Sequence, residues 1–330
     1  MDRREFLAGT GAVLLGTPLA AEAQQSGRIY RLGILAPGPW VPSDRLSLSL
    51  RVSTALRDLG YVEGQNLALE VRFAQGKPDR LPGLARELVQ LGVDVIFAIG
   101  TLSVRAARDA TTTIPIVMFN QLDPVAAGFA RSLARPGGNI TGVLIAAEGT
   151  LAGKRLGLLK EAVPRATRIA LLSLDDTGVR VQVEEARKAA PSLGVELIVV
   201  EVQDGDYDRA FATIAAERAA ALFVLAHSYF ANAQGRTRII GLAAKYRLPA
   251  IYEWREHVED GGLMAYGGIQ SELARQVAVY VARIFKGAKP ADLPIEQPTR
   301  FELSINLKTA TALGLTFPPS ILARADRVIQ

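Results

Sequence analysis

Cysteine is absent from the chain, and the only histidines are His227 and His257. Without cysteine the protein can form neither a disulfide nor a thiolate metal site, and it offers no thiol for a lipid anchor. Two histidines without cysteine are too few for most zinc sites. The composition therefore excludes a disulfide framework and predicts that the protein holds no metal.

Motifs that bind nucleotides or support hydrolysis are also missing. The sequence has no G-x-S-x-G nucleophile elbow, no G-x-x-x-x-G-K-[ST] phosphate loop and no H-E-x-x-H metal helix. His227 and Ser228 are adjacent, but without an elbow a His-Ser step at a strand end is more typical of a loop contact than of a catalytic pair. We therefore expect no cofactor and no enzymatic activity.

The excess of basic residues is small and dispersed. The formal net charge is +5, and the lysines and arginines form no run of the kind that binds nucleic acid. This pattern is typical of a solvated basic surface, so we expect no nucleic-acid partner.

Residues 1–23 have the three parts of a secretory signal peptide. The pair Arg3-Arg4 is followed by an apolar stretch from Leu7 to Ala21, and Ala21-Glu22-Ala23 fits an A-x-A cleavage site. The apolar stretch is too short to cross about 30 Å of hydrocarbon, which argues against a membrane anchor. Paired arginines indicate the twin-arginine route, which carries folded cargo. We expect cleavage after Ala23 and a mature protein that is free in the periplasm.

Short apolar runs alternate with amphipathic stretches along the rest of the chain. Such repeated units predict parallel sheets with helices on both faces. The series is too long for one core, so it predicts an α/β protein with two doubly wound parallel-sheet lobes. The expected strands are Arg31–Ala36, Leu67–Phe73, Val93–Ile99, Pro115–Phe119, Ile140–Ile145, Arg168–Leu174, Val195–Val202 and Ala221–Ala226. The amphipathic stretches between and after these strands, which continue the strand–helix series, are 43–60, 80–91, 103–110, 124–134, 152–162, 179–193, 207–218 and 231–246.

Several blocks of the sequence resemble one protein family. They are GYVEGQN at residues 60–66, the segment 111–142 with its TTTIPIV, DPV and SLARPGGNITG motifs, FKGAKPADLP at 285–294, and NLKTA with LGL within 306–315. These blocks are typical of the ABC-transporter substrate-binding family that includes the tryptophan- and tyrosine-binding proteins of the TrpX type. The resemblance extends over essentially the whole mature chain.

The resemblance implies a type I periplasmic binding fold, in which a three-strand hinge joins the two lobes. Lobe one would then comprise residues 28–146 and 260–294, and lobe two residues 147–259 and 295–330. The implied function is that of the periplasmic substrate-binding subunit of an ABC uptake transporter. Such a subunit is a monomer that binds a small carboxylate, here an aromatic or branched amino acid, and delivers it to a membrane permease.

Two other functions are compatible with a chain of two α/β domains. One is an exported enzyme that acts on a sugar or an aromatic acid, and the other is a ligand-sensing regulator. A regulator would need a helix-turn-helix before the first lobe, where residues 1–27 carry the export signal instead. Fold alone does not decide between these functions, but the missing catalytic motifs favour binding.

Ligands of parallel α/β sheets bind outside the carboxyl ends of the strands. Both tryptophans and several other aromatic residues fall at the expected strand ends, which suits an apolar or aromatic ligand. The residues that we expect to bind the ligand are Ala36, Trp40, Thr101, Ser103, Phe119, Asn120, Asp175, His227, Tyr229, Tyr252, Glu253 and Tyr266.

The segment Gly100-Thr101-Leu102-Ser103 predicts a carboxylate site. It joins a strand end to a helix start, where free backbone N–H groups and the helix dipole attract an anion. A threonine that only caps the helix with its hydroxyl is the alternative interpretation.

A ligand ammonium group would need an acidic partner. Asp123 precedes Pro124, so it is either that partner or, as we favour, the N-cap of a helical turn. The competing partners in lobe two are Asp175, Asp176 and Glu253.

Overall fold

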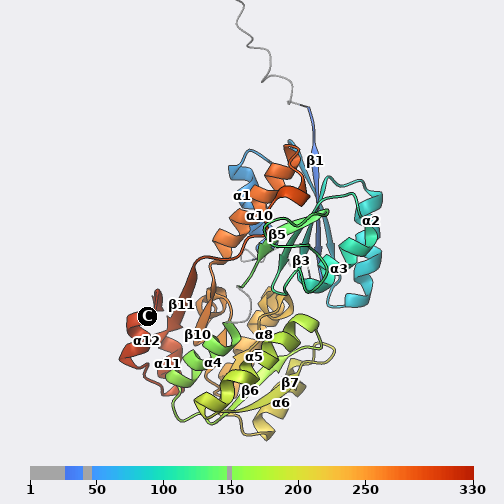
Figure 1. Cartoon of the computed structure of the whole chain (residues 1–330). Coiled ribbons are helices and arrows are strands. Elements are labelled where there is room, and N and C mark those ends of the chain that lie inside the picture. The colour runs from blue at the N-terminus through green and yellow to red at the C-terminus, as the bar shows by residue number, and fades with distance from the viewer. Residues whose placement is uncertain (1–26, 40–46, 147–150) are drawn as a thin grey trace, which may run out of the picture.

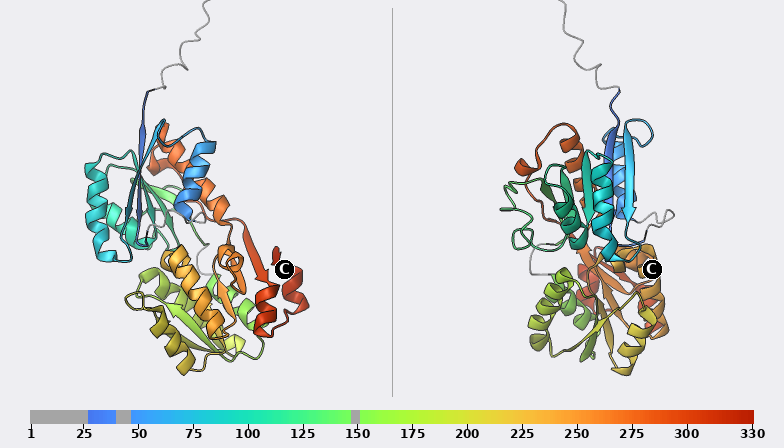
Figure 2. Two further views of the ribbon diagram at one scale, coloured as in Figure 1. Left: turned by 180° about the vertical axis from the view of Figure 1, so that it is seen from behind. Right: turned by 90° about the vertical axis from the view of Figure 1, so that its right-hand side faces the viewer.

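The chain folds into two α/β lobes that lie one above the other (Figures 1 and 2). The structure is a computed structural model that describes residues 27–39, 47–146 and 151–330. The signal peptide expected at residues 1–23 therefore lies outside the described residues, as does Trp40. Within the described ranges, no helix is long and apolar enough to cross a membrane.

Lobe one contains a five-stranded sheet in which every neighbouring pair of strands is parallel. The strand order is β2-β1-β3-β4-β5, so successive crossovers run in both directions from β1, as in a doubly wound sheet. The strands are β1 (Tyr30–Ala36), β2 (Leu67–Phe73), β3 (Val95–Ile99), β4 (Ile116–Asn120) and β5 (Ile140–Leu144).

Helices cover both faces of this sheet, two on each side (Figure 1). The alternation of side chains along β3 serves both faces: Val95, Phe97 and Ile99 pack with α1 and α10, whereas Ile96 and Ala98 pack with α2 and α3. The helices of this lobe are α1 (Leu48–Asp58), α2 (Leu81–Gln90), α3 (Thr101–Ala110) and α10 (Gln270–Phe285), with 3-10 turns at Pro78–Arg80 and Pro290–Asp292.

Lobe two contains a seven-stranded sheet with the order β12-β11-β10-β9-β8-β6-β7. Its pairs are parallel except for β10 with β11, which are antiparallel. The strands are β6 (Arg168–Ser173), β7 (Glu196–Glu201), β8 (Ala221–Val224), β9 (Ala250–Tyr252), β10 (Met264–Gly268), β11 (Phe301–Asn306) and β12 (Arg327–Ile329).

The helices of lobe two also lie on both faces of their sheet, with α4 and α5 on one side and α6 and α8 on the other (Figure 1). They are α4 (Leu151–Ala162), α5 (Thr177–Leu193), α6 (Tyr207–Ala216), α7 (Ser228–Ala231), α8 (Ala233–Lys245), α9 (Arg255–Glu259), α11 (Leu307–Leu313) and α12 (Pro319–Arg324). Two doubly wound lobes confirm the fold class that the strand–helix alternation predicts.

The chain passes between the lobes three times: after β5, between β10 and α10, and before β11. The second passage differs from our expectation, which assigned residues 260–294 to lobe one. Strand β10 pairs with β9 and β11, so residues 260–268 belong to lobe two. Residues 293–296 stay in lobe one, where the Leu144 N–H donates to the Glu296 carbonyl. The passages therefore follow Ile145, lie at Ile269 and lie at residues 297–300.

The stretch 124–134 is a series of turns instead of a further helix. Gly128 has φ +71, a left-handed conformation that ends regular helix here. Asp123 nevertheless acts as a cap, because its carboxylate accepts a hydrogen bond from the Val125 N–H at 2.8 Å.

Candidate functional site

A cavity of about 110 Å³ lies between the two lobes, at the carboxyl ends of their strands. Residues from the ends of β1, β2, β3, β4 and β5 form one wall, and residues after β8 and β9 form the other. The lining residues are Ala36, Pro37, Gly38, Pro39, Ser47, Leu48, Ser49, Phe73, Ile99, Gly100, Thr101, Phe119, Asn120, Gln121, Ile145, His227, Ser228, Ala231, Asn232, Glu253, Trp254 and Gln270.

The lobes contact each other directly around this cavity. The Gln121 side chain of lobe one donates to the Ala226 carbonyl of lobe two at 2.8 Å. Phe119 of lobe one stacks on Trp254 of lobe two, with ring centroids 6.5 Å apart and an interplanar angle of 25°. Trp254 even packs within the hydrophobic core of lobe one. This structure therefore shows the lobes closed.

Both lobes contribute apolar surface to the cavity, which forms an aromatic wall. Phe119, Phe73, Ile99 and Ile145 come from lobe one, and Trp254 comes from lobe two. Large aromatic surfaces of this kind favour a flat or branched apolar group through burial and ring–ring contact.

The start of α3 faces the cavity without a side-chain cap. Its N-cap residue is Gly100, at φ 81 and ψ 158, a conformation that only glycine adopts readily. The Thr101 hydroxyl does not cap the helix, because it donates to the Asn120 side-chain oxygen at 2.7 Å. The free N–H groups of the first turn therefore keep their capacity for an anion.

His227 contributes a neutral imidazole to the wall of lobe two. Its Nδ1 accepts the Tyr229 N–H at 3.1 Å, which leaves the proton on Nε2. Burial lowers the pKa of His227 from its usual 6.5, although the charge of Asp176 opposes that shift. The ring is therefore a hydrogen-bond donor at neutral pH.

Glu253 places a carboxylate in the same wall. Its Oε1 lies 3.5 Å from Nη2 of Arg155, and both residues are buried. Burial raises the pKa of Glu253 to about 7, whereas the Arg155 guanidinium acts in the opposite direction. Burial also lowers the pKa of Arg155. Burial thus brings the pKa of the Glu253 carboxyl close to neutral pH.

Six of the residues expected from the sequence line the cavity, and their role in binding a ligand stays a prediction. They are Ala36, Thr101, Phe119, Asn120, His227 and Glu253.

Two of the expected aromatic residues lie in the core of lobe two instead. The Tyr252 ring stacks on His257 with centroids 4.8 Å apart, and Tyr266 stacks on Phe301 at 6.0 Å. Both belong to strands, where successive side chains point to opposite faces and pack against helices. The expectation that Tyr266 ends a strand of lobe one is wrong, because β10 belongs to the sheet of lobe two.

Three other expected residues are not part of the cavity lining. Ser103 is fully buried within α3, and its hydroxyl has no hydrogen-bond partner. Asp175 is exposed and forms an ion pair with Arg180. Tyr229 stacks on Tyr207 in a separate groove at the lobe boundary. Ser103 and Tyr229 lie two residues and one residue from the lining positions Thr101 and Ser228, a precision that strand ends alone do not give, whereas no residue close to Asp175 in the chain lines the cavity.

Several lining residues are not among those expected to bind the ligand. Phe73 ends the expected strand Leu67–Phe73, so the strand pattern could have identified it. Trp254 is one of the two tryptophans that the sequence places at strand ends, although it is not among the expected ligand contacts. Gln270 begins α10 after the lobe passage at residue 269, and no local signal marks it as a cavity residue.

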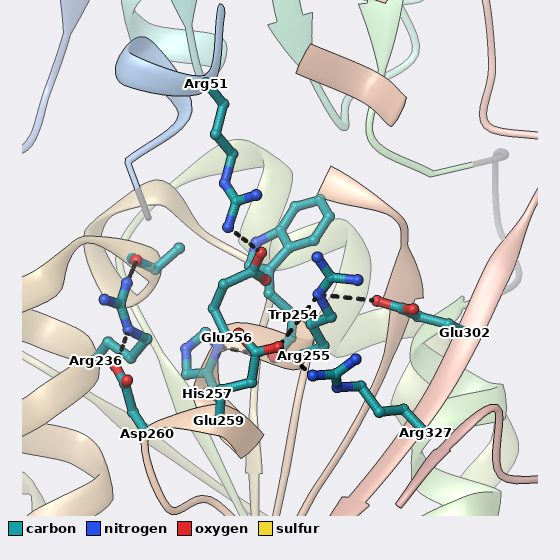
Figure 3. Close-up of polar contacts among 11 residues, drawn as sticks. Arg51, Arg236, Trp254, Arg255, Glu256, His257, Glu259, Asp260, Glu302 and Arg327 are labelled. Atoms are coloured by element: carbon teal, nitrogen blue, oxygen red, sulfur yellow. Dashed lines mark hydrogen bonds and ion pairs between the residues drawn. The ribbon is translucent and has the colours of Figure 1, made fainter. Parts of the chain in front are cut away.

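A polar network around α9 joins the lobes beside the cavity (Figure 3). Arg51 on α1 reaches from lobe one to Glu256 on α9, with 2.8 Å between Nη2 and Oε1. Arg255 lies between Glu259 and Glu302, at 3.6 and 3.7 Å. The network therefore connects α9, which begins two residues after Glu253, both to lobe one and to β11.

No group of three or more histidine, aspartate or glutamate side chains in the described ranges could hold a metal ion. The chemistry of the cavity is that of hydrogen bonds, one carboxylate and aromatic surface.

Several known proteins resemble this chain over most of its length. The family model for ABC transporter substrate binding proteins matches residues 47–329. A tyrosine-binding protein of Clostridioides difficile (strain R20291) is 26% identical over 263 residues, which is 79% of this chain and 74% of that relative.

Two solved structures share the fold over nearly the whole chain. A conserved domain protein of Vibrio cholerae has a TM-score of 0.81 at 27% identity, and covers 91% of this chain and 100% of its own. An ABC domain of Streptococcus pneumoniae in complex with L-Trp has a TM-score of 0.80 at 25% identity, with the same coverage. The two lobes thus form a type I periplasmic binding fold, and the chain belongs to the ABC transporter substrate-binding protein family.

Proposed function

We propose that the protein binds an aromatic or branched amino acid in the cavity between its lobes and releases it unchanged to the permease of an ABC importer. The observation that carries this proposal is the pairing of the aromatic wall with the uncapped start of α3. The Phe119–Trp254 stack suits an apolar side chain, and the N–H groups beyond Gly100 suit a carboxylate.

The relatives support the same ligand class. One is a tyrosine-binding protein and another was solved with L-Trp. Both ligands combine a carboxylate with a flat ring, which is the combination that the wall and the helix start suit.

Export through the twin-arginine route supplies the location of this function. The Arg3-Arg4 pair and the Ala21-Glu22-Ala23 site support delivery to the periplasm and cleavage after Ala23. Replacement of both arginines by lysine should retain uncleaved precursor in the cytoplasm. Normal cleavage and delivery of that variant would contradict the route. In the periplasm the protein acts as a monomer.

Calorimetric titration of the mature protein tests the ligand directly. The panel should contain the L-amino acids and their deaminated acids, and the bound compound should be recovered and identified after incubation. We expect saturable binding of at least one aromatic or branched member and recovery of the intact compound. A chemically altered product would instead support an enzyme, and no binding by any member would contradict the proposed ligand class.

A further inference from the structure

Two buried acceptor oxygens in the cavity have no hydrogen-bond donor. One is Oε1 of Glu253 and the other is Oε1 of Gln270. Both residues line the cavity, and they are only 5% and 9% exposed. A buried acceptor without a partner is unfavourable, so each oxygen gains from a donor that a ligand brings.

The fold places these two residues just after neighbouring strands, Gln270 at the start of α10. Glu253 follows β9, Gln270 lies just beyond β10, and the two strands are parallel neighbours. Gly267 allows the strand ends to approach closely, because a Cβ there would lie 2.2 Å from the Glu253 carbonyl oxygen. The juxtaposition is therefore built into the sheet of lobe two and the start of α10.

The charge of the cavity selects the type of donor. Among its lining residues within the described ranges, Glu253 is the only carboxylate, and none is a lysine or arginine. Arg155 lies behind Glu253, but at 3.5 Å it leaves its own Nη2 and the Glu253 Oε1 without a hydrogen bond. Its Nε is committed to the Tyr266 carbonyl at 2.6 Å. A small cation with several N–H donors completes this arrangement better than a neutral hydroxyl does.

We propose that Glu253 and Gln270 form an ammonium subsite, which makes this cavity selective for zwitterionic amino acids over simple carboxylic acids. The ligand then lies with its ammonium group at the ends of β9 and β10 and its carboxylate at the start of α3. The inference rests on the proposed function, because it concerns the same cavity and specifies the charge of its ligand.

The test compares matched ligand pairs that differ only in the amino group. Suitable pairs are L-tryptophan with indole-3-propionate, L-phenylalanine with 3-phenylpropionate, and L-leucine with 4-methylpentanoate. A charge-assisted hydrogen bond contributes about a tenfold to hundredfold difference in affinity, so we expect wild type to bind the amino acid of a recognised pair at least about tenfold more tightly.

Variants assign that preference to the two side chains. Gln270→Met keeps the length of the side chain and removes the acceptor, and it disturbs no ion pair. It should weaken binding of the amino acid by about tenfold and of the deaminated acid by less than about twofold. Glu253→Gln should abolish most of the remaining preference. Because this change leaves Arg155 without its counter-ion, thermal unfolding of the variant must first show an intact fold.

The outcomes separate the inference from the proposed function. Equal affinity of wild type for both members of every pair that binds would overturn the ammonium subsite and leave carboxylate binding intact. An equal loss for both members in Gln270→Met would also overturn it. Binding of neither member of any pair would overturn the proposed ligand class together with this inference.

Discussion

Two ion pairs with buried carboxylates begin in one short segment of lobe two, and they differ in the lobe of the partner, in distance and in hydrogen bonding. Glu253 pairs with Arg155 of the same lobe at 3.5 Å, without a hydrogen bond between the two contacting atoms. Glu256 pairs with Arg51 of the other lobe at 2.8 Å, with a hydrogen bond. Glu253 lines the cavity, whereas neither Arg51 nor Glu256 does.

The difference separates two tasks that a closing binding protein must perform. A loose pair whose carboxylate lines the cavity keeps hydrogen-bonding capacity for a ligand, so it determines which ligand binds. A hydrogen-bonded pair across the lobes stabilises the closed form whatever the ligand is. The first pair should therefore control selectivity, and the second should control how strongly closure contributes to every affinity.

The largest expected effect, on the free energy of unfolding, comes from removing Arg155, the cation that pairs with Glu253. Arg155→Met leaves Glu253 buried without its counter-ion and removes the hydrogen bond to the Tyr266 carbonyl. We expect the free energy of unfolding to fall by about 3–5 kcal/mol, measured by urea denaturation. The matched control is Arg180→Met, which removes an exposed ion pair with Asp175 and should change little. Equal effects of the two variants would contradict the structural role of the buried pair.

Breaking the pair between the lobes should weaken all ligands alike. In the Arg51→Met variant the closed form retains the Glu256 carboxylate, 4% exposed, without this hydrogen bond. We expect about a tenfold loss of affinity for every ligand that binds, with unchanged ratios between ligands. Calorimetry measures the affinities, and small-angle scattering should show a larger radius of gyration for the variant at equal ligand concentration. A loss of affinity confined to amino acids, with the deaminated acids unaffected, would show that Arg51 controls ligand selectivity and not closure.

The pH dependence should distinguish the two carboxylates. A ligand ammonium binds the deprotonated form of Glu253, whose pKa is raised to about 7 by burial. Affinity for an amino acid should therefore be full above about pH 7 and fall as the pH drops below it, by at most about tenfold per pH unit.

The deaminated acid serves as the control for this titration. Burial also raises the pKa of Glu256, and any loss of closure from its protonation affects both ligands equally. His227 stays neutral through most of this range because burial lowers its pKa. The ratio of the two affinities therefore isolates Glu253, and a ratio that does not change between pH 8 and pH 6 would contradict its role as the ammonium partner.

The smallest effect is expected at the rim, where Tyr229 lies outside the cavity in a groove with Gly76 and Gly205. Tyr229→Phe keeps the ring that stacks on Tyr207. Affinities measured by calorimetry should stay within about threefold of wild type, with the same ratios between ligands. A large loss of affinity for one ligand only would show that Tyr229 contacts that ligand, as the sequence analysis predicts.

Most of the fold could be predicted from the sequence because its signals are local. The apolar run Leu67–Phe73 matches β2 at both ends, and the alternation of units predicts two doubly wound lobes. The sheet to which a strand belongs is not a local property. β10 was assigned to lobe one because the choice depends on its pairing with β9 and β11, which involves residues far apart in the chain.

The candidate site was predictable where a residue directly follows a strand. His227 and Glu253 line the cavity, whereas Tyr252, one residue earlier than Glu253, points into the core. A shift of one residue reverses the face in a strand, so aromatic character alone could not separate these positions. Gln270 was not predictable because it reaches the cavity from the start of a helix of lobe one.

A crystal structure of the wild-type protein with a bound amino acid would reveal the orientation of the ligand in the cavity. We expect the ligand nitrogen within about 2.7–3.2 Å of both Glu253 and Gln270, and the carboxylate against the N–H groups that follow Gly100. A ligand in the reverse orientation, with its carboxylate beside Glu253 or its nitrogen contacting neither side chain, would show that Glu253 and Gln270 do not form an ammonium subsite.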